Sequence, residues 1–142
     1  MAGRRVVALL AALGLSASAA VAQPAVNAHI TPKRGHPDTT FRVGFTAPQT
    51  AGHQGVYERS YSVELSVRGR GCAQSAATEV TQATAGRRVR VWFKPASRWC
   101  LGRGRGSISM TEGPYCNPPD PCPEFPTRTS EIAQVDFRVV RR

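Results

Sequence analysis

The sequence predicts an all-β fold, specifically a seven-stranded immunoglobulin-like antiparallel sandwich. Short segments alternate apolar and polar residues with a period of two, and turns rich in Gly and Pro separate them. No window after the N-terminal two dozen residues shows a helical period. A chain of 142 residues, 41% of them hydrophobic, is long enough for one domain and too short for several.

The clearest alternation places Tyr61, Val63, Leu65 and Val67 on one side of a strand and Ser or Glu on the other. This pattern is typical of an antiparallel strand with one face on a core and one face in water. The same reasoning applies to the other segments, with weaker alternation in the first, fourth and sixth. The expected strands are 26–31, 40–46, 60–67, 77–82, 87–94, 104–111 and 131–140.

The N-terminus has the features of an export signal. Two arginines precede a short apolar run, and Ala20-Val21-Ala22 forms a small-residue cleavage motif. We therefore expect residues 1–22 to be a signal peptide, helical and outside the fold, and residues 23–142 to be the domain. The protein is then secreted or extracellular, at the cell surface or released, with no transmembrane segment after the signal is removed. A retained N-terminal anchor is the alternative.

Four cysteines in an exported chain predict two disulfides. They are Cys72, Cys100, Cys116 and Cys122, and their spacing contains no C-x-x-C pair that would favour zinc. On the strand map the first two fall in connections at one end of the sandwich and the last two in one connection at the other. A strand of six residues spans about 20 Å, and a disulfide joins Cα atoms no more than about 7 Å apart. The predicted pairs are therefore Cys72–Cys100 and Cys116–Cys122.

A resemblance supports this fold. The segments that carry it are Ile30-Thr31-Pro32, Thr40-Phe41-Arg42-Val43-Gly44-Phe45, Gly71-Cys72, Arg90-Val91, Trp99-Cys100 and Cys122-Pro123. With these segments the chain resembles small, mostly uncharacterised exported proteins of actinobacteria that have immunoglobulin-like or fibronectin type III-like domains. The resemblance covers nearly all of residues 26–140 and implies the fold, but no activity. It departs from antibody domains, because the second strand lacks the cysteine of their core disulfide.

Basic residues dominate the charge, with Lys+Arg 19 against Asp+Glu 9 and a formal net charge of +10. The topology gathers several of them at one end of the sandwich. The candidate anion-binding residues are Lys33, Arg34, Arg68, Arg70, Arg98, Arg103 and Arg105. They indicate an anionic partner such as a polymer of the cell envelope. The alternative is an ordinary solvated surface whose arginines reflect a GC-rich genome. Nucleic acid is not expected, given export and the lack of a base-stacking motif.

The connection 112–127, at the other end, is a second candidate site. It holds six of the 11 prolines and the predicted Cys116–Cys122 disulfide, which together would preorganise a binding loop. The candidate binding residues of this end are His53, Tyr57, Tyr115 and Phe125. A stapled loop that only covers the end of the sandwich is the alternative.

Catalytic, metal-binding and cofactor-binding residues are not expected. The three histidines accompany no nucleophile motif, and the strand map separates His53 from His29 and His36. The sequence therefore predicts a secreted, non-catalytic module for adhesion or recognition, whose partner is an anionic envelope polymer or another surface protein. A small secreted enzyme or inhibitor that uses the 112–127 loop is the alternative.

Overall fold

The computed structural model describes residues 26–48, 57–81, 83, 85–114 and 127–142. Within these ranges the chain forms strands and no helix. The strands are β1 (His29–Thr31), β2 (Arg34–Gly35), β3 (Phe41–Thr46), β4 (Tyr57–Gly69), β5 (Cys72–Thr81), β6 (Arg88–Phe93), β7 (Gly102–Pro114) and β8 (Arg128–Val139). The expected signal peptide and the Cys116–Cys122 pair lie outside the described residues. The described residues include no helix that could span a membrane.

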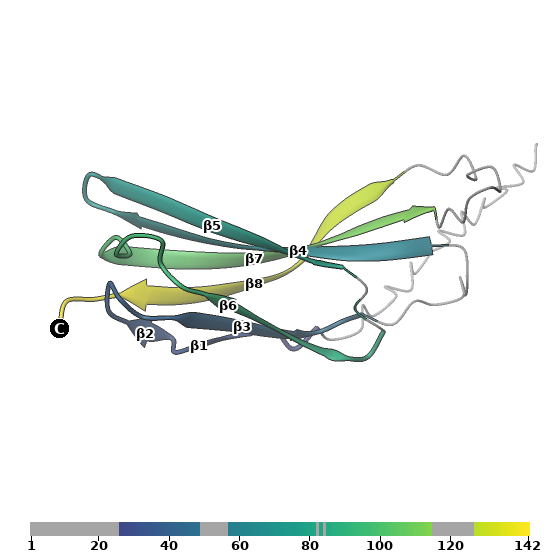
Figure 1. The fold of residues 1–142 in the computed structure, drawn as a ribbon, viewed down its shortest axis with the longest axis horizontal. Helices are drawn as coiled ribbons and strands as arrows, with labels where there is room; N and C mark the ends of the chain where they lie inside the picture. Colours follow the sequence, from purple (N-terminus) through teal and green to yellow (C-terminus); the bar gives the residue numbers. More distant parts are fainter. Residues whose placement is uncertain (1–25, 49–56, 82, 84, 115–126) are drawn as a thin grey trace, which may run out of the picture.

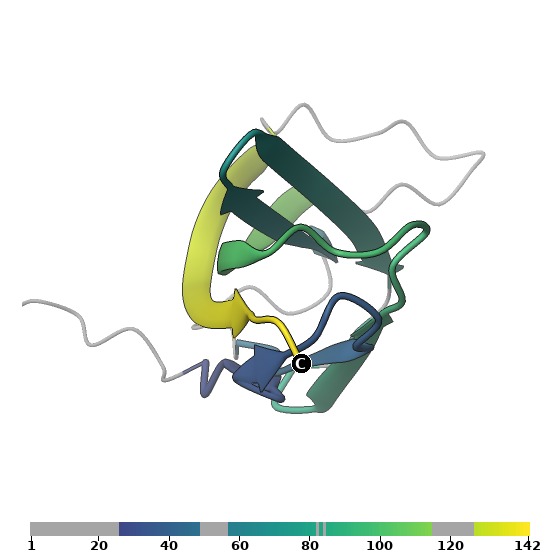
Figure 2. The ribbon, with the colours of Figure 1, turned by 90° about the vertical axis from the view of Figure 1, so that its left-hand side faces the viewer.

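The strands form two sheets, with the order β1-β3-β6 in one and β2-β8-β7-β4-β5 in the other. Figures 1 and 2 show the two sheets facing each other as a sandwich. All paired strands are antiparallel except β2 and β8. The all-β prediction is thus confirmed. The number of strands is different: the structure has eight where seven were expected, because the two-residue strand β2 is added. Each expected range overlaps one of the other strands, but β5 begins at Cys72 and not at residue 77, so Cys72 lies in a strand rather than in a connection.

Alternating apolar side chains from both sheets fill the space between them. Phe45 of β3 packs against Tyr61 of β4 with ring centroids 5.4 Å apart, and Phe41 packs against Phe137 of β8 at 4.5 Å. Among the described residues no polar or charged side chain is buried in this core besides the tyrosine. Burial of apolar area on both inner faces is the main source of stability for such a sandwich.

Strands β4 and β7 are 13 residues each, longer than the predicted 60–67 and 104–111. β7 begins with Gly-Arg-Gly-Arg-Gly and pairs with β4 as far as Arg103. In this segment Gly104 and Gly106 are buried and both arginines are exposed. A Cβ atom at Gly104 would collide with the Phe137 ring, and one at Gly102 would collide with the Arg68 carbonyl. The extension matters for the surface, because it moves Arg68 and Arg103 from expected connections and strand ends into the sheet.

Candidate anion-binding surface

Four arginines lie side by side across the outer face of the five-stranded sheet. Arg34 of β2 pairs in register with Arg138 of β8, Arg138 pairs with Arg103 of β7, and Arg103 pairs with Arg68 of β4. Residues directly opposite one another point to the same face of a sheet. All four are exposed, and the next residue along each of the four strands is less exposed. We call these four residues the arginine row.

The arginines of the row have no salt-bridge partner among the described residues. Neighbouring strands are about 4.8 Å apart, so the row distributes four positive charges over roughly 15 Å. Like charges directly opposite each other destabilise a sheet. In the adjacent row Asp136 lies 3.9 Å from Arg105, and both side chains are exposed. A bound anion would relieve the repulsion.

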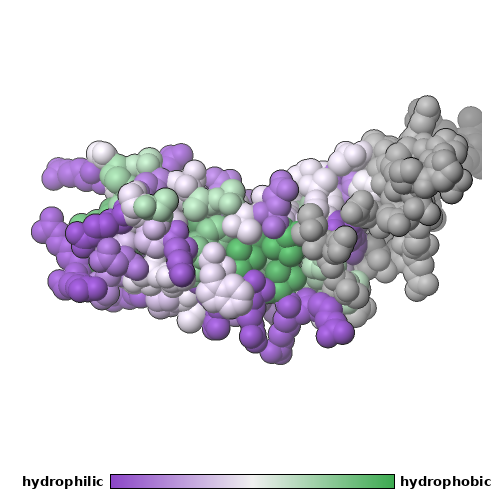
Figure 3. Space-filling view, in the orientation of Figure 1, coloured by the Kyte–Doolittle hydropathy of each residue, from purple (hydrophilic) through white to green (hydrophobic). Residues whose placement is uncertain are grey.

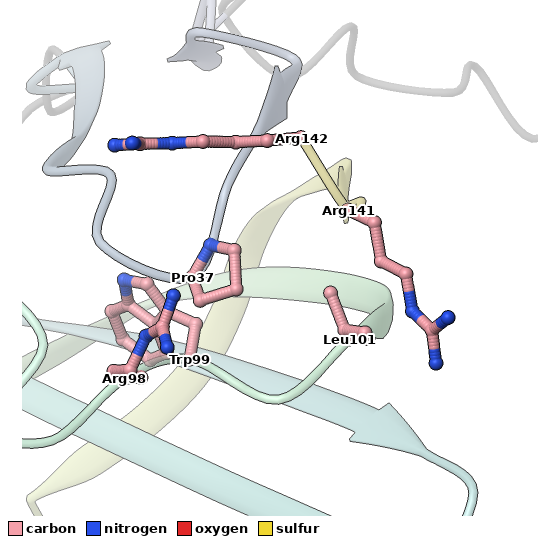
Figure 4. A pocket seen from close by; sticks show the side chains of 6 residues that line it. All are labelled: Pro37, Arg98, Trp99, Leu101, Arg141 and Arg142. Carbon is pink, nitrogen blue, oxygen red and sulfur yellow. The ribbon is translucent and has the colours of Figure 1, made fainter.

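Further basic residues surround the same end of the sandwich. Arg70 occupies the β4–β5 turn, where Gly71 adopts a φ of +67° that favours glycine. A shallow, open pocket of about 370 Å³ lies nearby and is lined by Pro37, Arg98, Trp99, Leu101, Arg141 and Arg142. Figure 4 shows Arg141 and Arg142 on the C-terminal segment and the other labelled residues on two connections. Hydrophilic side chains gather at this end in the space-filling view (Figure 3).

The connection between β6 and β7 is tied to its neighbours at this end. The predicted Cys72–Cys100 disulfide is confirmed, with a Cα–Cα distance of 5.9 Å. Beside it, Gln74 Nε2 donates to the Arg98 carbonyl at 3.0 Å, and Gln74 Oε1 accepts from the Cys100 amide at 2.6 Å. The buried Trp99 ring donates from Nε1 to the Thr39 carbonyl at 2.9 Å. These contacts hold the connection in one position relative to β5 and the β2–β3 connection.

The structure brings only part of the predicted basic set together. Arg34, Arg68 and Arg103 belong to the arginine row. Arg105 is in the adjacent row, Lys33 precedes β2, and Arg98 pairs with Asp38 at 3.1 Å. Of the predicted binding residues at the other end, Tyr57 begins β4. The remaining three, His53, Tyr115 and Phe125, lie outside the described residues. The strand map also brings Arg138 to this end, together with Arg141 and Arg142, and the alternation of 131–140 places it on the face away from Phe137 and Val139. Arg138 is nevertheless absent from the predicted anion-binding set.

The opposite end contains a partly buried ion pair next to a buried tyrosine. Arg59 donates from Nε to Glu112 Oε1 at 2.7 Å and from Nη1 to the Pro48 carbonyl at 2.8 Å. Tyr61 is 1% exposed, and its hydroxyl has no hydrogen-bond partner in the described structure. Burial raises the pKa of Tyr61 above its ordinary value of 10.0, while the positive charge of Arg59 opposes the increase.

Tyr61→Phe is expected to raise the free energy of unfolding at neutral pH by about 1 kcal/mol, because it removes a buried hydroxyl without a partner. The raised pKa adds a pH dependence. The unfolded chain loses the tyrosine proton at lower pH than the folded protein does, so stability falls as pH rises above about 10. The phenylalanine variant lacks this component. Urea denaturation of both proteins at pH 7 and pH 10.5 measures the difference, and a less stable variant at pH 7 would contradict the prediction.

No protein-family model matches the chain, and a comparison with curated proteins finds no match. Among the described residues, no three His, Cys, Asp or Glu side chains come together as a metal site requires. The surface itself is therefore the basis for inferring a function.

Proposed function

We propose that the protein is a secreted, non-catalytic module of immunoglobulin-like topology that binds a linear polyanion of the cell envelope. The observation that carries the proposal is the arginine row, in which backbone pairing aligns four arginines across one sheet, none of them in a salt bridge among the described residues. An anionic polymer laid across the strands would contact several of them at once. The role of this binding is adhesion or recognition at the cell surface.

The strand order supports the immunoglobulin-like assignment. The N-terminal segment contributes β1 to one sheet and β2 to the other, where β2 pairs in parallel with the last strand. The five-stranded sheet contains two antiparallel pairs of consecutive strands, β4–β5 and β7–β8. The Cys72–Cys100 disulfide supports secretion, because disulfides persist mainly in oxidising compartments.

Guanidinium chemistry favours carboxylate, phosphate or sulfate groups as the anions. Each guanidinium presents a planar set of donors that matches two oxygens of such a group. Contacts of this kind at exposed positions are screened by salt, and a polymer that spans the row displaces several counterions. The alternative, an enzyme or inhibitor that acts through residues 112–127, remains a prediction, because most of that loop lies outside the described residues.

Changing Arg68 and Arg103 together to Gln tests the proposal. We expect the dissociation constant for inorganic polyphosphate of defined length to rise at least tenfold, because two adjacent cations of the row are lost. The dependence of log K on log salt, measured by calorimetry at several salt concentrations, should become shallower by about two. Both substitutions are at exposed positions, and the pairing of the strands involves only their backbones. Each substitution should therefore change the free energy of unfolding by only about 0.5 kcal/mol.

The matched control removes the same charge elsewhere, with Arg87 and Arg88 changed to Gln. Both residues are exposed; Arg88 begins β6 and Arg87 directly precedes it, and β6 belongs to the sheet that does not carry the arginine row. We expect this control to retain most of the affinity. Equal weakening in the two double variants would show that only net charge matters and would reject the row as a site.

A further inference from the structure

Trp92 is an exposed aromatic residue on the outer face of the other sheet. Its side chain belongs to β6, where exposed and buried residues alternate, and 59% of Trp92 is accessible to solvent. The only other large hydrophobic residue exposed in the described part of the chain is Leu101, which lines the pocket at the basic end. Among the described residues, the indole is therefore the single large apolar group exposed on this face.

Those surroundings are cationic. Arg42 of β3 pairs in register with Trp92, which places the two Cβ atoms about 5 Å apart on the same face. Arg90 precedes Trp92 by two residues on β6, and Lys94 follows it by two; both are exposed. No ion pair in the described structure joins Arg42, Arg90 or Lys94 to a carboxylate. The indole thus lies among positive charges that no salt bridge of the described residues neutralises.

A second ring, the imidazole of His29, lies beside the residues around Trp92. His29 of β1 pairs with Gly44 of β3, and Gly44 pairs with Arg90. The imidazole occupies the space above Gly44, since a Cβ atom there would lie 2.6 Å from His29 Cε1 and Nε2. A hydrogen bond of 3.2 Å between His29 Nδ1 and the Asn27 carbonyl holds the ring. The face therefore offers two rings in adjacent rows, with arginines in both rows.

We propose that Trp92, Arg42 and Arg90 form a binding site for an acidic polysaccharide. The C–H face of a pyranose ring would stack on the indole, which supplies a large rigid contact area. The carboxylate or sulfate of the sugar would accept hydrogen bonds from a guanidinium in the bidentate manner. This site does not depend on the arginine row, because the two surfaces are on different sheets. A ligand of the Trp92 site needs sugar rings in addition to negative charge.

Two other occupants fit this face less well. In a symmetric dimer through this face, the same cations of both copies would oppose one another, which is unfavourable. Binding to an anionic membrane scales with the apolar area that is inserted. Trp92 alone among the described residues of this face offers a large apolar side chain, which is little for a membrane but sufficient for one sugar ring.

Tryptophan fluorescence can test the site, because Trp92 is exposed whereas Trp99, the other tryptophan, is only 4% exposed. Acrylamide quenching therefore reports mainly Trp92. We expect an oligogalacturonate to protect this emission from quenching. The methyl ester of the oligogalacturonate has the same rings without charge, and tripolyphosphate has charge without rings. We expect each of them to need at least a tenfold higher concentration to give the same protection.

Variants separate this site from the arginine row. Binding of the oligogalacturonate by Trp92→Ala, measured by calorimetry, should weaken at least tenfold, and Trp92→Phe should recover part of the affinity. In the Arg68→Gln/Arg103→Gln variant the protection of Trp92 should persist, whether or not that variant still binds polyphosphate. Far-UV circular dichroism checks that each variant is folded.

Three results would overturn the proposal. Equal protection by the methyl ester would show that the cations are not used, and equal protection by tripolyphosphate would show that the indole is not a stacking surface. Protection by phosphatidylglycerol vesicles without protection by the oligogalacturonate would identify a membrane-contacting face instead.

Discussion

Replacement of Cys72 and Cys100 by Ser is expected to lower the free energy of unfolding by about 3–4 kcal/mol. The two cysteines are 28 positions apart, and a crosslink of this span removes much conformational entropy from the unfolded chain. Most small domains are stable by only 5–15 kcal/mol, so the loss would shift a urea transition clearly. The denaturation midpoint and slope of the variant and of the parent protein measure it.

The predicted Cys116–Cys122 pair provides a comparison within the same chain. A crosslink between these residues closes a much shorter loop, so its removal should cost only about 2 kcal/mol. Peptide mapping without reduction should give a fragment containing Cys72 joined to Cys100. A loss below 1 kcal/mol on removal of Cys72–Cys100 would contradict the loop-length argument.

The disulfide variant also distinguishes binding at the arginine row from binding at the β6–β7 connection. Cys100 belongs to the β6–β7 connection that carries Arg98, whereas strand pairing fixes the arginine row. As long as the variant is folded, binding of polyphosphate to the row should persist. Such a result would place the recognition on the sheet rather than on the pocket at its end.

Local patterns in the sequence predicted the strands well because each strand reports its own buried face. The alternation around Tyr61 and Val63 reappears as buried and less buried residues along β4. Trp92 alternates with Val91 and Phe93 along the expected strand 87–94, and this alternation likewise places Trp92 on the face away from the core. Even β2 is understandable afterwards, since only two residues pair with β8 and two residues cannot display a period.

The arginine row could not be predicted in the same way. It depends on which strands are neighbours and on the register between them, and both are non-local properties. Arg68 and Arg103 fall in connections of the strand map, because the expected strands end at residue 67, before Gly69-Arg70-Gly71, and begin again only at residue 104. The close approach of Gly102 to Arg68 and Gly69 of β4 explains why both strands continue there as a pair. The same limitation hid the proximity of Arg42 to Trp92.

The second large loss of stability is expected for Arg59→Met, which breaks the ion pair between Arg59 and Glu112 at the opposite end of the sandwich. The side chains of Arg59 and Glu112 are only 13% and 29% exposed, and the substitution leaves the carboxylate partly buried without its partner. Breaking a buried pair from one side typically costs 3–5 kcal/mol. Because Glu112 retains some contact with solvent, we expect a loss of about 2–3 kcal/mol in the free energy of unfolding, measured by urea denaturation.

The double variant Arg59→Met/Glu112→Leu should recover most of that loss, since an apolar pair of similar volume often replaces an ion pair at little cost. Asp38→Asn is the matched control, because it breaks the exposed pair of Asp38 and Arg98. These side chains are 50% and 73% exposed, so the loss should be less than about 1 kcal/mol.

Arg59→Met should also raise the pKa of Tyr61 further, because the positive charge that opposes the effect of burial is gone. The tyrosine absorbance would then titrate at higher pH in the variant. A double variant as unstable as the single one would show that Arg59 stabilises the fold mainly through its bond to the Pro48 carbonyl, and not through the charge of Glu112.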